Sequence, residues 1–72
     1  MANVHTKNYQ KFIKLLRKAR HEAGLSQVEV AKKLNKPQTY VSKCELAERR
    51  VDVTELKLFA KIYKKSVNYF LD

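Results

Sequence analysis

The stretch that decides the fold is SQVEVAKKLNKPQTYVSKCEL, residues 26–46. It opens with Ser26 and, three residues later, Glu29, which together form the pattern of a helix-capping box. Asn35, a residue that tolerates left-handed backbone, stands where this short helix should end. The apolar residues between these two signals recur at helical spacing and predict an inner face of Val30, Ala31 and Leu34.

A second short helix follows after only two or three residues. We expect it to run from about Pro37, which suits a first helical position, to Leu46. Its apolar face is thin and consists of Val41 and Cys44. The remaining side chains are hydrogen-bonding groups rather than the Glu/Lys pairs that usually solubilise a helix, so we expect this helix to present a binding surface. They are Gln38, Thr39, Tyr40, Ser42 and Lys43.

Three further helices flank this pair. Upstream, a helix is predicted over Lys7–Ala23, followed by Gly24 as a left-handed cap, with an inner face of Phe12, Ile13, Leu16, Ala19 and Ala23. Downstream, Asp52 or Thr54 caps a helix that reaches Tyr63, with Leu56, Phe59, Ala60 and Tyr63 inward. A last short helix from Ser66 offers Val67 and Phe70 to the core. No segment alternates with period two, so the prediction is an all-α bundle in one domain, residues 1–72.

Charge points to a polyanionic partner. The chain has 16 Lys and Arg against 7 Asp and Glu, a net charge of +9, with a pI of about 9.9. Residues 1–50 carry 12 basic and 4 acidic side chains, whereas residues 51–72 carry 4 and 3. This asymmetry favours nucleic acid, an acidic membrane surface or an acidic protein as the partner of the first part.

Several classes of protein are disfavoured. Cys44 is the only cysteine, which excludes an internal disulfide and a metal site built from several cysteines, so neither a metal nor a cofactor is expected. No apolar run is long enough to span a membrane, and the N-terminal residues do not resemble a signal peptide, so we expect a soluble, cytoplasmic protein. A chain of 72 residues leaves little room for a catalytic pocket, and an enzyme is not expected.

The sequence closely resembles the lambda-repressor-like (Cro/repressor) family of helix-turn-helix DNA-binding proteins. The resemblance is carried by residues 24–34 and 38–45, with the Gly-Leu-Ser-Gln start, and extends over roughly Phe12 to Leu71. It implies a five-helix bundle whose helix-turn-helix spans about 26–46 and whose third helix reads the major groove of double-stranded DNA.

The resemblance also implies roles for individual residues. Base reading is expected from Gln38, Thr39, Ser42 and Lys43, since a glutamine amide matches the N7 and N6 edge of adenine. Phosphate contacts are expected from Ser26, Gln27, Tyr40, Arg49 and Arg50, with Gln27 also buttressing Gln38. For Tyr40, packing at the helix edge is the alternative. A partly buried ion pair is expected between Arg20 and Glu45.

The chain departs from the family pattern at a few positions. Relatives often have glycine where Asn35 and Ala47 stand, so the loop after the third helix is expected to take another shape. Cys44 replaces a larger aliphatic residue, and Lys64-Lys65 replaces a Gly-plus-aliphatic turn before the last helix.

Four apolar residues remain outside the predicted core. They lie in the near-neutral last third of the chain, where two copies can meet without strong repulsion, and we expect them to form a homodimer interface. The alternative is that they thicken a small core. They are Leu58, Ile62, Tyr69 and Leu71.

The function expected is a transcriptional regulator that binds a two-fold-related operator as a homodimer. A phage repressor, a restriction–modification controller and an antitoxin all fit this description, and the small size favours a controller or a Cro-like protein. One alternative is a protein-interaction module whose main partner is another protein, such as a toxin. Another is a membrane-active role of the basic first helix, which the matched core pattern disfavours.

Overall fold

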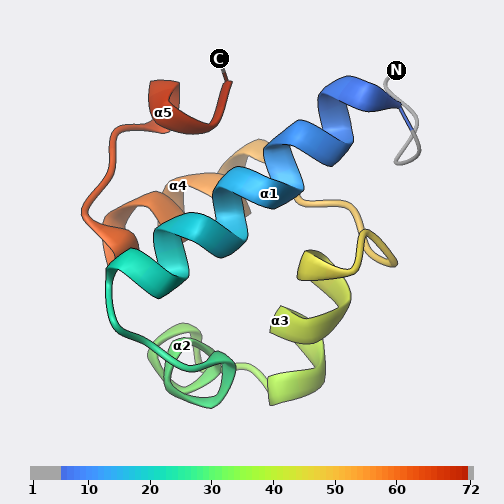
Figure 1. Ribbon diagram of the computed structural model, residues 1–72. Coiled ribbons are helices and arrows are strands. Elements are labelled where there is room, and N and C mark those ends of the chain that lie inside the picture. The colour runs from blue at the N-terminus through green and yellow to red at the C-terminus, as the bar shows by residue number, and fades with distance from the viewer. Residues whose placement is uncertain (1–5, 72) are drawn as a thin grey trace.

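Helix α1 (Lys7–Glu22) crosses the middle of the molecule (Figure 1). The computed structural model describes residues 6–71. Over that range the chain forms five helices and no strand, which confirms the all-α prediction and the predicted order of elements. The remaining helices are α2 (Gln27–Leu34), α3 (Gln38–Glu45), α4 (Val53–Tyr63) and α5 (Val67–Leu71).

The core is formed by buried side chains from all five helices. Phe59, the largest fully buried residue, comes from the inner face predicted for α4. The other fully buried large side chains, from the first three helices, are Leu16, Val30, Val41 and Cys44. Helix α5 closes the opposite end of the bundle from α2 and buries Phe70 (Figure 1). Ala23, predicted to face inward, is instead exposed because α1 ends at Glu22 and Ala23 forms its C-terminal cap.

Side chains cap the N-termini of four helices but not that of α3. Ser26 with Glu29 and Asp52 with Glu55 form complete capping boxes, and Thr6 and Ser66 accept a backbone N–H bond at α1 and α5. Pro37, predicted as the first helical residue of α3, is in fact its N-cap, because its ψ of 156° is extended. It makes no side-chain capping bond, so the first turn of α3 depends on other partners.

Within residues 6–71, three non-glycine residues adopt the left-handed backbone that glycine usually supplies. Asn35, Ala47 and Lys64 have φ of 57°, 61° and 57°, alongside 71° at Gly24. The expected change of loop shape is therefore not needed to accommodate Asn35 and Ala47, since both take up left-handed dihedrals. The cost is higher at Ala47 than at Asn35, because asparagine tolerates this region better than alanine does.

Candidate nucleic-acid interface

Helix α3 presents one polar face and buries the other. Gln38, Thr39 and Lys43 are exposed and Ser42 is half-buried, all within one side of the helix. On the opposite side the buried residues are Val41, Cys44 and Glu45. A turn of three residues, Asn35 to Pro37, joins α3 to α2 and leaves this polar face open.

A chain of hydrogen bonds connects the polar face to the interior. Gln38 Nε2 donates to Gln27 Oε1 at 3.1 Å, and Gln27 Nε2 donates to Glu45 Oε1 at 3.1 Å. Glu45 in turn accepts two bonds from Arg20, from Nε at 2.7 Å and from Nη2 at 3.1 Å. The structure thus brings together four residues that the sequence analysis assigned separately to the ion pair, to buttressing and to base reading.

The buried carboxylate sets the direction of every bond in this chain. An ionised carboxylate only accepts, so Gln27 must turn its NH2 group toward Glu45 and its carbonyl oxygen toward Gln38. Gln38 must then donate to Gln27 through Nε2. What remains for a ligand is one N–H and the carbonyl oxygen of Gln38, a donor beside an acceptor, which is the pattern that adenine matches in the major groove.

Arg20 forms the inner end of this series of hydrogen bonds. Its side chain is 11% exposed and that of Glu45 is 3% exposed. The third guanidinium contact runs from Nη1 to the carbonyl oxygen of Leu25 at 3.0 Å, which ties α1 to the start of α2. The hydrogen bonds to Glu45 raise the pKa of Arg20, so the guanidinium keeps its charge.

The N-terminus of α2 offers a second set of donors beside Gln38. The backbone N–H groups of Gln27 and Val28 have no acceptor within residues 6–71, as expected for a first helical turn. Ser26 accepts the N–H of Glu29 at 3.1 Å, which leaves its own hydroxyl proton to donate. Such a helix end attracts phosphate groups.

Tyr40 and Arg49, both predicted phosphate contacts, have partners within the protein. Tyr40 donates its hydroxyl to Glu55 Oε2 at 2.5 Å and stacks on the ring of Phe59. Arg49 Nη1 lies 2.6 Å from the same oxygen of Glu55, and its guanidinium lies 4.6 Å from the centre of the Tyr40 ring. For Tyr40, the structure thus matches the packing alternative.

Glu55 is the centre of this second cluster, which we call the Tyr40–Arg49–Glu55 cluster. Burial acts to raise the pKa of Glu55, but the Asp52 backbone N–H, the Tyr40 hydroxyl and Arg49 outweigh it and hold that pKa below its usual value. Burial and the bond to Glu55 raise the pKa of Tyr40. The cluster joins the first turn of α3, the loop after α3 and the first turn of α4, and so holds that loop against both helices.

Arg50 is the cation of this loop that remains available. Its side chain is exposed and forms no ion pair within the described residues; only its carbonyl oxygen is used, by Arg49 Nη1 at 2.9 Å. The next residue is anchored, because the Val51 N–H donates to the Tyr9 hydroxyl at 3.1 Å. Arg50 therefore projects from a segment whose backbone is held on both sides.

The residues predicted for a dimer interface lie on two different surfaces. Leu58 and Ile62 border a groove between α2 and α4, whereas Leu71 borders a separate hollow with Leu56. Leu56 and Leu58 are about 200° apart around α4. Tyr69 and Ile62 are half-buried against the core, while Leu58 is 50% exposed and Leu71 is 67% exposed.

Two residues that shape the interface were not found from the sequence. Glu55 follows Asp52 at capping-box spacing, a pattern that would have indicated one role but not its contacts with Tyr40 and Arg49. Tyr9 continues the inner face of α1 one turn upstream of Ile13 and is 9% exposed. The helical period could have found its burial, but not its bond to the Val51 backbone.

A capped helix, a three-residue turn and a second helix with an open polar face that includes Gln38 define a helix-turn-helix DNA-binding domain. The comparisons agree: residues 13–70 match the family model described as Helix-turn-helix. The chain belongs to this family, in its lambda-repressor-like branch, and the family is not enzymatic.

A solved structure supports the same assignment. The XRE-family like protein from Pseudomonas syringae pv. tomato str. DC3000 shares 41% sequence identity and superposes with a TM-score of 0.86, covering 94% of this chain and 83% of that one. No curated protein gives a significant match. None of the helices within residues 6–71 is long and apolar enough to cross a membrane.

Proposed function

We propose that the protein is a sequence-specific transcriptional regulator that binds a two-fold-related operator in double-stranded DNA as a homodimer. The observation that carries this proposal is the hydrogen-bonded chain from Arg20 to Gln38. It holds an exposed amide in one orientation before DNA arrives, and a preorganised donor–acceptor pair is what reading of a base edge needs.

In this proposal, α3 lies in the major groove. Gln38 and Thr39, at its N-terminal end, contact base edges, and Ser42 and Lys43 contact bases or phosphates one turn later. Ser26, Gln27 and Arg50 bind the phosphate backbone on either side. Arg49 and Tyr40 act indirectly, by holding the loop that carries Arg50.

The dimer of this proposal uses the hollow beside Leu71. This hollow, of about 300 Å³, lies between the start of α1, the segment before α4 and α5, and no lysine lines it. Val53 and Leu71, each 67% exposed, are the apolar side chains that a second copy would cover. Pairing there leaves both copies of α3 uncovered, as two half-sites about 34 Å apart require.

Selection of bound sequences from random DNA duplexes tests this function directly. We expect enrichment of a two-fold-related site. On that site, a dimer that neutralises about 6–8 phosphates gives a slope of log K against log salt concentration of about −5 to −7. Selection without any enriched sequence, together with a slope near zero, would contradict the proposal.

A further inference from the structure

A groove with an apolar floor and a basic rim lies between the C-terminal halves of α2 and α4. Its volume is about 500 Å³, and we call it the lysine groove. Leu58 is half exposed there, beside the half-buried Leu34 and Ile62. The rest of its lining is cationic and exposed: Lys33, Lys61 and Lys64.

The near neutrality of residues 51–72 does not extend to this groove. The acidic side chains of α4 are at its other end, where Asp52 and Glu55 form the capping box. An adjoining hollow shares Lys33, Ile62 and Lys64 with the groove and adds Glu22, but that carboxylate is already paired with Lys65 at 2.9 Å. Glu29 lies one turn before Lys33 on α2, and its carboxylate accepts the Ser26 N–H at 2.9 Å. The three lysines outnumber these two acidic neighbours, so the groove carries a local positive charge over an apolar surface.

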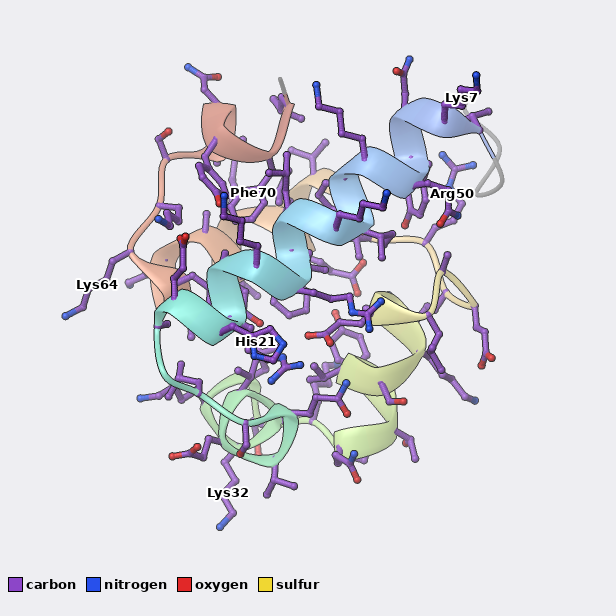
Figure 2. All side chains as sticks on the ribbon, in the orientation of Figure 1. Lys7, His21, Lys32, Arg50, Lys64 and Phe70 are labelled. Atoms are coloured by element: carbon purple, nitrogen blue, oxygen red, sulfur yellow. The ribbon has the colours of Figure 1, made fainter. Side chains whose placement is uncertain are left out.

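This combination of charge and apolarity disfavours two occupants. A second copy would bring two sets of three lysines face to face, and like charges across an interface are strongly unfavourable. DNA would leave Leu58 and Ile62 without apolar partners. The groove also faces away from the DNA-contacting loop, since Lys64 and Arg50 lie at opposite edges of the molecule (Figure 2).

We propose that the lysine groove docks an acidic amphipathic segment of another protein. Apolar side chains of that segment would pack on Leu58 and Ile62, as in other helix-in-groove complexes, while its flanking carboxylates would meet the three lysines. Docking here leaves the polar face of α3 open, so this partner and the operator can bind at the same time. The inference does not depend on which sequence α3 reads.

Binding of a synthetic helical peptide, with leucines on one face and glutamates elsewhere, tests the proposal. Isothermal titration is made on the full chain, and its lysine-groove variants are Leu58→Ser and the double variant Lys33→Glu/Lys61→Glu. The matched control is Lys11→Glu/Lys14→Glu on α1, which changes the net charge equally at exposed positions. A peptide of the same composition in scrambled order separates amphipathic docking from general attraction to a basic protein.

We expect the ordered peptide to bind at least tenfold more tightly than the scrambled one. Leu58→Ser and Lys33→Glu/Lys61→Glu should each weaken binding at least tenfold, with the control close to wild type and operator affinity of Leu58→Ser unchanged. Circular dichroism melts verify folding. If Leu58→Ser unfolds, the comparison of Lys33→Glu/Lys61→Glu with the control variant still tests the proposal.

Four results would each overturn the proposal. The first is the absence of peptide binding, and the second is equal loss in the groove and control double variants. The third is a change of sedimentation with Leu58→Ser, which would mean that a second copy occupies the groove. The last is loss of binding to anionic vesicles in the groove variants alone, which would identify a membrane surface instead.

Discussion

Two polar clusters flank helix α3, and they use the same kinds of residue for opposite purposes. On one side, the bonds from Arg20 through Glu45 and Gln27 end at Gln38 on the surface. On the other side, Tyr40 and Arg49 both converge on Glu55 and keep their polar groups within the protein. A carboxylate organises each cluster, but only the first delivers a free donor and acceptor to the outside.

The difference lies in where each carboxylate sits. Glu45 is buried, so its partners must form a chain that leads outward before any group meets water. Glu55 lies in the first turn of α4, where the Tyr40 hydroxyl and the Arg49 guanidinium contact it directly. Residue type alone therefore does not indicate which polar side chains near a recognition helix will face DNA.

Removing Glu45 should have the largest effect. Truncation to alanine leaves the Arg20 guanidinium without its partner in a place that is hardly exposed, and we expect a loss of about 3–5 kcal/mol in the free energy of unfolding. Replacing both residues, as in Arg20→Met/Glu45→Leu, should cost less than that. Denaturant melts of Arg20→Met, Glu45→Leu and the double variant measure this coupling. Small, additive losses would show that the two side chains do not depend on each other.

Removing Gln38 or Gln27 from the series of hydrogen bonds that starts at Arg20 should affect DNA recognition more than stability. Gln38→Ala should cost about 1–3 kcal/mol on the selected operator and leave binding to random DNA unchanged. Gln27→Ala should cost part of the same discrimination, because Gln38 then loses the partner that orients its amide. Competition binding against random duplexes measures both. If Gln27→Ala weakened cognate and random DNA equally, Gln27 would act only through phosphate.

Substitutions of the neighbouring residues Arg49 and Arg50 should have different effects, one on stability and the other on DNA binding. Arg50→Ala should flatten the salt dependence by about one unit per half-site and leave the melting temperature unchanged. Arg49→Ala should instead lower the free energy of unfolding by about 0.5–1 kcal/mol, through the lost ion pair and the lost contact with the Tyr40 ring, with little change in slope. Salt titrations and melts of both variants are needed. The reverse assignment would mean that Arg49 leaves Glu55 when DNA binds.

The loop that Arg49 helps to fix contains a strained residue. Ala47→Gly should stabilise the protein by about 0.5–1 kcal/mol, since glycine removes the cost of the left-handed backbone and gives back part of it as unfolded-state entropy. Asn35→Gly is the matched comparison and should give less. Thermal melts measure both, and a destabilised Ala47→Gly would show that the alanine methyl group contributes packing that outweighs its strain.

The smallest effect expected is a change in the pH dependence of stability. The pKa of Glu55 in the folded protein is lowered from its ordinary value of 4.5. The stabilisation from this group is therefore complete above that value and is lost as the pH falls through the folded-state pKa. Melts between about pH 6 and 3 should fall less steeply for Glu55→Gln than for wild type. Parallel curves would assign the acid sensitivity to other carboxylates.

Most of the fold follows from local signals in the sequence. The capping box at Ser26, the glycine after α1 and the spacing of Leu56, Phe59 and Tyr63 each depend on neighbours within four residues, and the structure confirms them. The exceptions lie at helix ends, because Pro37 is the N-cap of α3 rather than its first residue, and Ala23 is the C-terminal cap of α1 rather than part of its inner face.

Contacts between distant residues were harder to predict. The resemblance indicated the pairing of Arg20 with Glu45, and the structure brings the two together; spacing alone would not have suggested it. Nothing in the sequence showed that Glu55 contacts both Tyr40 and Arg49. Nor did it show that Leu58 and Leu71 lie on different surfaces of the protein. Net charge per segment also concealed the lysine groove, since Asp52 and Glu55 lie at the start of α4, whereas Lys61 and Lys64 lie at its end.

The uncapped start of α3 has a consequence for the dynamics of binding. The amide N–H groups of Gln38 and Thr39 have no acceptor within residues 6–71, like those of Gln27 and Val28 at the start of α2, whereas the Tyr40 N–H donates to the Pro37 carbonyl oxygen at 3.0 Å. They should exchange hydrogen for deuterium rapidly in the free protein, at rates close to those of an unfolded peptide. On operator DNA the same amides should become protected, as phosphate oxygens or base edges accept their hydrogen bonds. The recognition helix would then gain its last stabilising contacts only from the DNA it reads.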